Sequence, residues 1–442
     1  MTVVASSHAD EHVNEREAGD KMAGRAFDVV IFGATGFTGK LASEHLTRRL
    51  AGDASLRWER FALAGRNREK LVAVRKRLEE ISPRAKELQL LVGDGNSEEF
   101  LETMCKKTNV VLTYVGPYLK YSLPLARACV KYGTDYCDIT GEAPYQVKIV
   151  EELHEEAKSK GVTLITSCGY DSIPFDVGTY GLVKHLRTKQ KGGKIAIQTC
   201  TGPARGSASG GTIASAESFV GGPPLSPHCL DTQFLSSDVV EGKLPFNVGN
   251  FHNRSKSWLC PSIMEGVNQK VIYRSRGLMQ DLYGVDFTWQ QFTAVKTKFQ
   301  LFAAKALMGV ITFVLSNSYA KGLLLRTGVL PKPGEGPSEE ILQSGFFNEF
   351  IYGSVGEYEA AVHVKGRRGD PGYKLTSAMS LHTALMLSQK DSLKGELNML
   401  GGVLTPAACM GDLLWRKMPD VDVTFELKEN TSSLPIFDDK SN

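Results

Sequence analysis

The sequence predicts an α/β protein that combines a doubly wound parallel sheet with a second, mixed α+β domain. An apolar run at 27–32 leads into a glycine-spaced loop and a helix-like pattern. Strand-like and helix-like segments then alternate as far as residue 166, which is typical of a parallel sheet. The alternation stops after about Phe175. We therefore expect a disordered tail at 1–25, a first domain at 26–175 and a second domain at 176–442.

Each element of the first domain is expected from a short local pattern. Apolar runs predict strands, and amphipathic segments between them predict helices. Ser97 is a suitable N-cap for the third helix, and Gly116-Pro117 ends the fourth strand. The expected strands are 27–32, 60–64, 88–92, 110–115, 135–139 and 162–166. The expected helices are 40–50, 69–81, 97–107, 123–132 and 145–160.

The second domain shows fewer signs of parallel units. Residues 202–227 are rich in Gly, Ser and Pro and are expected to form an active-site loop or lid. Residues 331–337 are expected to form a turn-rich linker. The C-terminal helices of this domain could pack back on the first domain. Strands are expected at 194–201, 358–364 and 421–427, and a helix at 375–387.

The glycine-spaced loop after the first strand predicts a dinucleotide site of the Rossmann type. Gly33 allows a sharp turn out of the strand, and Gly36 lets a pyrophosphate approach the backbone. Gly39 lets the following helix pack closely on the strand, and the N–H groups at the helix start favour phosphate. The spacing is GxxGxxG rather than the commoner GxGxxG, and a plain structural turn is the alternative. The residues expected to bind the cofactor are Gly33, Ala34, Thr35, Gly36, Phe37, Thr38 and Gly39.

The residues after the second strand favour NADP(H) over NAD(H). A site for NAD usually places Asp or Glu there to bind the ribose 2′-hydroxyl, whereas this chain has Gly65-Arg66. The guanidinium of Arg66 suits a 2′-phosphate, although it could be an ordinary exposed arginine. Asp94, after the third strand, is expected either to contact the adenine or to cap the next helix.

The end of the fourth strand is expected to lie beside the nicotinamide, because ligands bind where the strand order of such a sheet reverses. Gly116 and Pro117 stand at this end and are assigned to the cofactor site. Tyr118 and Tyr121 follow, and both are candidate catalytic residues, as stacking groups or proton donors. The alternative for Tyr118 is packing over a loop.

Composition and charge argue against several classes of function. The net charge of the 442-residue chain is +3 at pH 7, which does not favour a nucleic-acid partner. The eight cysteines form no C-x-x-C pair, so no metal site is expected and a reducing compartment fits. Residues 1–25 are polar and lack the hydrophobic region of a signal peptide. A cytoplasmic protein is therefore expected.

One apolar segment, 299–315, allows two interpretations. It contains Lys305 and is slightly short for a membrane span, so the first interpretation is a buried helix of the second domain. The second is a helix that contacts a membrane or lipid-droplet surface, through residues 299–330.

Several motifs together resemble those of the saccharopine dehydrogenase-like oxidoreductase family. Those of the first half are GATGFTG at 33–39, LAGRN at 63–67, VGPY at 115–118, DYCDITGE at 135–142 and GYDSIPFDVG at 169–178. Three later segments look most like the bacterial trans-acting enoyl reductases of that family, namely SGGT at 209–212, PKPGEGPS at 331–338 and GGVLTPAACMGD at 401–412. The resemblance covers nearly the whole chain beyond the tail, but residues from about 220 to 300 match poorly.

The resemblance implies an NADP-type nucleotide domain joined to an α/β domain. It also implies reduction of carbon–carbon double bonds during the assembly of complex lipids, including glycolipids. From the eukaryotic members it implies an association with lipid droplets or mitochondria. We therefore expect an NADP(H)-dependent oxidoreductase that acts on a lipid-like or acyl small molecule. A homodimer is left open.

The GYDS segment supplies two further catalytic candidates. Asp171 and Ser172 follow the sixth strand, and Pro174 suits the first turn of a helix. Either candidate could cap that helix, or contact substrate or nicotinamide at the mouth of the cleft. Asp138 and Glu142 stand at and after the end of the fifth strand and face the same rim, where either could position substrate or a proton.

Two alternatives to this function stay open. Ser167, Tyr180 and Lys184 resemble the serine–tyrosine–lysine triad of short-chain dehydrogenases. The long chain after Lys184 argues against that class, as does VGPY at the end of the fourth strand, where that family has an Asn-Ala-Gly signature. The other alternative is a membrane-associated or lipid-droplet protein in which the nucleotide has a structural or regulatory role, and the 299–315 segment motivates it.

Overall fold

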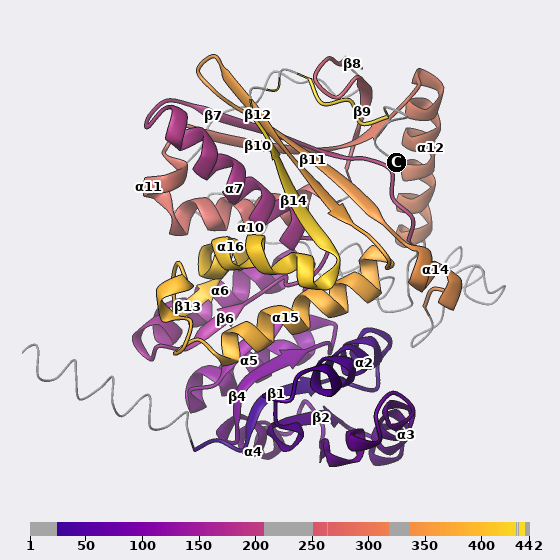
Figure 1. Ribbon diagram of the computed structural model, residues 1–442, viewed down its shortest axis with the longest axis vertical. Helices are drawn as coiled ribbons and strands as arrows, with labels where there is room; N and C mark the ends of the chain where they lie inside the picture. The colour runs from indigo at the N-terminus through magenta and orange to yellow at the C-terminus, as the bar shows by residue number, and fades with distance from the viewer. Residues whose placement is uncertain are drawn as a thin grey trace, which may run out of the picture.

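The described part of the chain contains two seven-stranded sheets with helices between and around them (Figure 1). The computed structural model describes residues 24–206, 251–262, 264–317, 336–429, 431 and 433–437. The predicted tail up to residue 23, most of the predicted lid and residues 318–330 lie outside the described residues. The expected fold class, a doubly wound parallel sheet with a second mixed sheet, is confirmed.

Sheet A, the first of the two, is parallel throughout. Its strands are β1 (Phe27–Phe32), β2 (Phe61–Gly65), β3 (Gln89–Val92), β4 (Thr108–Thr113), β5 (Asp135–Asp138), β6 (Thr163–Ile165) and β13 (Gly402–Leu404). They lie in the order β13-β6-β5-β4-β1-β2-β3. The order reverses between β1 and β4, so the carboxyl ends of these two strands border the crevice where such sheets bind ligands.

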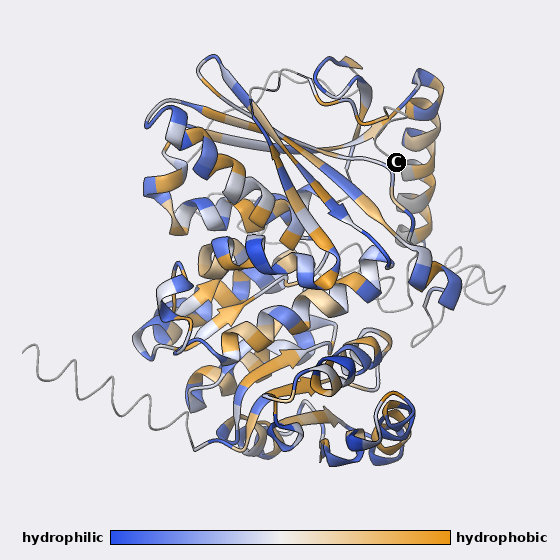
Figure 2. Cartoon of the chain, in the orientation of Figure 1, coloured by the Kyte–Doolittle hydropathy of each residue, from blue (hydrophilic) through white to orange (hydrophobic). Residues whose placement is uncertain are grey.

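Both faces of sheet A are buried except along the edge strand β3, as the largely apolar central strands predict (Figure 2). In β1, Val29 and Ile31 belong to one apolar cluster, whereas Val30 and Phe32 belong to another on the opposite face. The first face is covered by α2 (Phe37–Gly52), α3 (Arg68–Glu79) and α15 (Thr376–Ser388). The second is covered by α4 (Glu98–Lys106), α5 (Tyr118–Tyr132) and α6 (Ala143–Ser159).

The C-terminal part of the chain therefore completes the first sheet. Strand β13 pairs in parallel with β6, and α15 packs against β4, β5 and β1. Just beyond α15, the ammonium of Lys390 lies 2.7 Å from a carboxylate oxygen of the buried Asp135 on β5. Helix α15 thus covers a part of sheet A that the helices between the strands of the first domain leave uncovered.

Sheet B is antiparallel except between β7 and β10. Its strands are β7 (Ile195–Thr201), β8 (Phe251–His252), β9 (Ser257–Pro261), β10 (Phe287–Val295), β11 (Phe347–Val355), β12 (Tyr358–Gly366) and β14 (Val423–Lys428). They lie in the order β14-β12-β11-β7-β10-β9-β8. Short helix α14 (Glu339–Ser344) precedes β11, and α12 (Lys298–Ser316) stands beside β9 and β10.

A layer of helices separates the two sheets (Figure 1). It contains α7 (Ile173–Lys189), α10 (Glu265–Leu278), the short α11 (Gln280–Tyr283), α15 and α16 (Pro406–Lys417). The buried carboxylate of Asp176 in α7 accepts hydrogen bonds from the Ser275 hydroxyl at 2.5 Å and from the Ala407 N–H at 2.8 Å. It therefore ties α10 and α16 to α7, and fixes the start of α7 between the sheets.

Candidate functional site

The glycine loop joins β1 to α2 at the carboxyl edge of sheet A. Gly33 has a φ of +87°, a conformation that favours glycine. A Cβ on Gly39 would lie 2.2 Å from the carbonyl oxygen of Gly33, so α2 can pack this closely on the turn only with glycine there. Among the described residues, a Cβ on Gly36 would meet only that same oxygen, at 3.3 Å, so no described side chain fills the space in front of Gly36.

The start of α2 has the features of a phosphate site. Gly36 is its N-cap, and no side chain caps the helix, whereas Asn67 and Ser97 cap α3 and α4 with their side chains. The Lys40 N–H is bonded to the Gly36 carbonyl, so the three N–H groups before it point out of the helix end. A diphosphate would accept from these groups in the field of the helix dipole, and the cradle therefore fits a dinucleotide.

Arg66 and Asp94 lie after β2 and β3, on the same edge. Arg66 is exposed and forms no ion pair with any residue that the structure describes. Asp94 is also exposed, and its carboxylate accepts from the Asn96 N–H at 2.9 Å. Ser97, not Asp94, caps α4 by accepting from the Phe100 N–H. Arg66 is thus available to a 2′-phosphate, and the capping alternative for Asp94 does not apply.

Gly116 and Pro117 lie between β4 and α5, and the peptide bond that joins them is cis. Glu142 caps α5 from another segment, because its carboxylate accepts from the N–H groups of Tyr118 at 2.9 Å and Leu119 at 3.1 Å. Glu142 is therefore committed to holding this loop.

Tyr118 and Tyr121, the catalytic candidates of α5, differ in exposure. The Tyr118 ring is buried and packs 5.9 Å from the ring of Tyr145. Burial raises the pKa of the Tyr118 hydroxyl well above its ordinary value, so it stays protonated. Tyr121 is half-buried beside the Lys120 ammonium.

Asp138 organises the loops at the ends of β5 and β6. Its carboxylate accepts from the N–H groups of Thr140 and Ser167 and from the Tyr136 hydroxyl, at 2.8 to 2.9 Å. Burial raises the pKa of Asp138 to about 6, although these hydrogen bonds favour the ionised form. The Ser167 hydroxyl donates to the Thr140 carbonyl and accepts from the Gln146 amide. These side chains support the rim rather than open onto it.

The GYDS segment presents Asp171 and Ser172 beside the start of α7. Neither side chain caps α7, and the buried Ser172 hydroxyl has no hydrogen-bond partner among the described residues. The Asp171 side chain is exposed, yet the surrounding protein desolvates it enough to raise its pKa to about 6. Asp171 is therefore an exposed carboxyl group beside the start of α7 whose ionisation is disfavoured by the surrounding protein.

Two residues of this region were missed by the sequence analysis. The hydroxyl of Tyr170 donates to the carboxyl of Glu349 on β11, at 2.7 Å. Tyr170 belongs to the GYDS motif and directly precedes the candidate Asp171, so the sequence alone could have marked Tyr170 as a candidate. Glu349 shows only as a single acid within an apolar run, FFNEFIY, and no local signal connects it to residues 179 positions earlier.

Ser167, Tyr180 and Lys184 do not form the alternative triad in the described structure. Ser167 bonds to Thr140 and Gln146, as above, whereas the Lys184 ammonium pairs with Asp412 at 2.6 Å and lies over the Tyr180 ring. No hydrogen bond joins Ser167 to either partner among the described residues.

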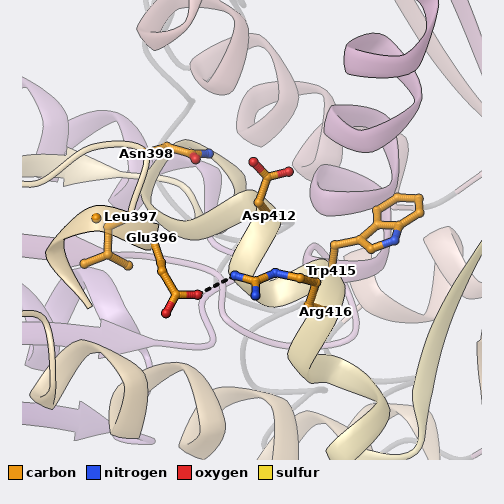
Figure 3. Close-up of a pocket in the computed structure, with 7 residues that line it drawn as sticks. Glu396, Leu397, Asn398, Asp412, Trp415 and Arg416 are labelled. Atoms are coloured by element: carbon orange, nitrogen blue, oxygen red, sulfur yellow. Dashed lines mark hydrogen bonds and ion pairs between the residues drawn. The ribbon is translucent and has the colours of Figure 1, made fainter. Parts of the chain in front are cut away.

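Two surface pockets lie elsewhere. One, of about 410 Å³, is lined by Gly395, Glu396, Leu397, Asn398, Asp412, Trp415 and Arg416, and an ion pair between Glu396 and Arg416 crosses it (Figure 3). The other, of about 560 Å³, adjoins Tyr180 and Asn398. Residues 395–398 precede β13 and so lie toward the amino ends of the sheet A strands, opposite the glycine loop. We therefore place the site at the carboxyl edge, where the cradle lies.

Comparison with known proteins agrees with this geometry. Residues 29–165 match the family model of the saccharopine dehydrogenase NADP binding domain, which confirms the expected NADP(H) cofactor. The chain is 32% identical over 423 residues to a trans-acting enoyl reductase of Mycobacterium tuberculosis, which covers 91% of this chain and 97% of that protein. A trans-acting enoyl reductase of Mycobacterium ulcerans is 31% identical over 422 residues, with the same coverage.

Among solved structures, apo saccharopine dehydrogenase (L-Glu forming) of Saccharomyces cerevisiae overlays on 90% of this chain and 99% of its own. The overlay has 13% sequence identity and a TM-score of 0.49. The full-length identity to the mycobacterial proteins and the match of the nucleotide domain identify the relationship. The chain belongs to the saccharopine dehydrogenase-like oxidoreductase family, together with the trans-acting enoyl reductases.

Proposed function

We propose that this protein is an NADPH-dependent reductase of an activated carbon–carbon double bond in a lipid-like acyl intermediate. The observation that carries the proposal is the 32% identity, over nearly its whole length, to a protein named as a trans-acting enoyl reductase. The cradle of the glycine loop and the unpaired Arg66 support the choice of NADPH.

The chain's own residues divide the work along the carboxyl edge of sheet A. The N–H groups at the start of α2 hold the diphosphate, Arg66 holds the 2′-phosphate, and Gly116 and Pro117 border the nicotinamide. NADPH supplies a hydride to the double bond when bound. Asp171 and Ser172 position the substrate at the rim, and Tyr118 and Tyr121 stay candidates as stacking groups or proton donors.

The charges at the rim favour an acyl substrate over a dicarboxylic amino acid. Asp171 and Asp370 are the carboxylates that act on Tyr170 beside Glu349, which is itself mainly neutral at pH 7 because its pKa is raised to about 8. Such a rim would repel a substrate with several carboxylates. The buried rings of Phe347 and Phe175 lie 4.7 and 6.3 Å from the ring of Tyr170, so this tyrosine packs on an apolar layer.

Titration with NADPH and NADH, followed by fluorescence and calorimetry, tests the first half of the proposal. We expect stoichiometric binding of NADPH. Oxidation of NADPH with crotonyl-coenzyme A and with trans-2-hexadecenoyl-coenzyme A tests the second half. Failure to bind either nucleotide would rule out the proposal, and binding without turnover on any enoyl thioester would reject the reductase activity.

A second candidate function rests on the surface of α12. Five large apolar side chains there are exposed, namely Phe299 (78%), Phe302 (73%), Leu307 (59%), Val310 (58%) and Phe313 (62%). At 3.6 residues per turn they fall within about 140° of one another around the helix axis. Leu301, on the opposite side, is buried toward sheet B. The helix therefore has one face packed on the protein and one apolar face in solvent.

The occupant that we propose for this face is a lipid surface. Lys298 and Lys305 lie along one edge of the apolar face, where the ammonium of Lys305 would meet lipid headgroups and that of Lys298 lies over the Trp258 ring. The helix has 19 residues, about 28 Å in length. Among the described residues, no helix is both long enough and apolar enough to cross a membrane. The helix would therefore lie in the interface of a membrane or lipid droplet.

Flotation with phosphatidylcholine vesicles and with triolein-filled droplets tests this second function. We expect the triple variant Phe299→Ser, Phe302→Ser, Phe313→Ser to lose binding to both, while NADPH binding is retained. The exposed Val285 lies on the loop before β10, and Val285→Ser serves as the control. Equal flotation of the triple variant and the unaltered protein would reject the lipid contact. Turnover discriminates between the two functions, because only the first predicts it.

A further inference from the structure

The Tyr170 hydroxyl and the Glu349 carboxyl form a bridge between the two sheets. Tyr170 follows the carboxyl end of β6 in sheet A, and Glu349 projects from β11 in sheet B. Their oxygens are 2.7 Å apart. The Tyr170 N–H also donates to the Thr376 hydroxyl at the start of α15, so three separate elements fix the position of this tyrosine. Tyr170 itself is half-buried, whereas Glu349 is inaccessible to solvent.

The Glu349 carboxyl group has the properties of a group that holds a proton at neutral pH. Burial raises its pKa to about 8, although hydrogen bonds from Tyr170 and Thr201 favour the ionised form. Its second carboxyl oxygen is buried and has no hydrogen-bond partner among the described residues. A buried oxygen without a partner is better accommodated in a neutral, protonated carboxyl group than in a carboxylate.

The groups around the pair keep both members neutral. Tyr170 faces Asp171 from its own loop, Asp370 from the segment before the helical turn at 371–375, and Glu349. Burial, followed by these carboxyls, raises the pKa of Tyr170 well above its ordinary value. On sheet B, Thr201 of β7 is paired in register with Glu349, and Cys200 lies on the other face of β7. No cation is among the groups that shift the pKa of either member, so no positive charge in the described surroundings favours a phenolate or a carboxylate.

Tyr170 differs from the other tyrosines of this rim. The Tyr114 hydroxyl, after β4, bonds to Ser380, which in turn donates to a backbone carbonyl of α15 and so leads to no acid. Tyr118 is buried in the layer of α5 and α6. Tyr170 alone, among these three, combines partial exposure with a direct bond to a buried carboxyl. Neighbouring strands are about 4.8 Å apart, so the ends of β6 and β4 are separated by about 10 Å, within reach of a substrate at the nicotinamide.

We propose that Tyr170 is the catalytic acid of the reductase and that Glu349 is the positioning residue that supplies it with a proton. The proposal rests on the proposed function. In enoyl reduction, NADPH gives a hydride to carbon 3 of the substrate, and carbon 2 needs a proton. The Tyr170 O–H bond breaks as the C–H bond at carbon 2 forms, and the phenolate then takes the proton of Glu349. After the product leaves, the proton returns from water to Glu349 through the half-buried Tyr170 hydroxyl, so the net reaction consumes one NADPH and one proton.

Kinetics of two variants with NADPH and crotonyl-coenzyme A test the assignment. Tyr170→Phe should lower kcat by a factor of about 100 or more, the usual contribution of a general acid, with NADPH affinity unchanged. Glu349→Gln should lower kcat less and should abolish the decline of kcat above about pH 8 that the unaltered enzyme shows. Tyr352→Phe is the matched control, because Tyr352 donates to the Leu434 carbonyl from the opposite face of the same strand.

Infrared difference spectroscopy gives a readout that does not need turnover. The unaltered protein at pH 7 should show the carbonyl band of a protonated carboxyl that titrates near pH 8 and is absent in Glu349→Gln. Because the bond from Tyr170 favours the ionised form, Tyr170→Phe should move this titration to higher pH. A band that has disappeared by pH 6 in the unaltered protein would overturn the role of Glu349.

The outcomes separate this inference from the proposed function. A kcat of Tyr170→Phe within threefold of the unaltered enzyme would overturn the catalytic acid and leave the reductase standing. A persistent alkaline decline in Glu349→Gln would overturn the proton supply alone. NADPH binding without turnover in the unaltered enzyme would overturn both.

Discussion

The glycine loop and the Tyr170–Glu349 pair lie at the same edge of sheet A, but they are assembled in different ways. The loop is one contiguous stretch in which Gly33 and Gly39 touch each other across a single turn. The pair joins residues 179 positions apart and depends on the packing of sheet B, α7 and α15. The nucleotide half of the site is therefore local, whereas the substrate half depends on the whole fold. Some substitutions should therefore impair only the nucleotide half of the site, and others only the substrate half.

The largest expected effect concerns the packing of the C-terminal segment on sheet A. Lys390→Met leaves the buried Asp135 carboxylate without its ion pair, which should lower the free energy of unfolding by about 3–5 kcal/mol. Urea denaturation measures the effect. Lys160→Met, which breaks an exposed pair with Glu156, is the control and should cost less than about 1 kcal/mol. If both variants lose the same small amount, the C-terminal segment does not hold sheet A together through this pair.

The next largest effect is expected in the nucleotide half of the site alone. Gly39→Ala places a Cβ 2.2 Å from the Gly33 carbonyl oxygen, so the start of α2 must move away from the turn. We expect NADPH to bind more than about 100-fold more weakly, a loss of about 3 kcal/mol, by fluorescence titration. Gly52→Ala, at the other end of α2, is the control because its Cβ would meet no atom within 4 Å. Unchanged affinity in Gly39→Ala would mean that the loop does not hold the diphosphate.

A third effect, of about 2 kcal/mol, reports on the long-range half. The pKa of Glu349 is about 8 in the folded protein and near 4.3 in an unfolded chain. Between these values the folded state keeps a proton that the unfolded state has lost, so the free energy of unfolding should fall as pH rises from 6 to 8. Glu349→Gln should flatten this slope. Glu426→Gln should leave it unchanged, because ion pairing with Lys365 lowers the pKa of Glu426. A slope that persists in Glu349→Gln would assign it to another group.

The smallest effect concerns cofactor choice. Arg66→Ser should weaken NADPH binding about tenfold, or about 1.4 kcal/mol, and leave NADH binding unchanged. Arg84→Ser, which removes an arginine paired with Glu87 on the surface, should change neither. Equal loss of both nucleotides in Arg66→Ser would show that Arg66 does not recognise the 2′-phosphate.

The same contrast explains what the sequence could predict. Strands of sheet A and the cap at Ser97 follow from patterns within a few residues, and the structure has them. The expected strand at 60–64 is β2, at Phe61–Gly65, and the expected helix at 375–387 is α15. Strand β13 has only three residues and joins the sheet by pairing with β6, more than 200 residues earlier, so no local pattern announces it. Strand β11 was missed because polar Asn348 and Glu349 interrupt its apolar run.

The candidate site divides along the same line. The glycine spacing could be read directly, because the backbone at the start of α2 requires it. Arg66 could be read from its place after the second strand, where an NAD site has Asp or Glu. The choice between capping and other roles at Asp94, Asp171 and Ser172 needed three-dimensional contacts. Tyr170 could not be preferred over Tyr118 until its bond to Glu349 was visible. A pKa that burial raises is a property of the assembled fold and not of a motif.

Transfer of an isotope from labelled NADPH tests the central claim most directly. NADPH that carries deuterium at both positions of carbon 4 of the nicotinamide would be incubated with the protein and crotonyl-coenzyme A, and the product would be analysed by mass spectrometry and NMR. The account predicts one deuterium at carbon 3 of a butyryl product, and one at carbon 2 when unlabelled NADPH is used in heavy water. A butyryl product without deuterium at carbon 3, or no product while NADPH binds, would contradict it.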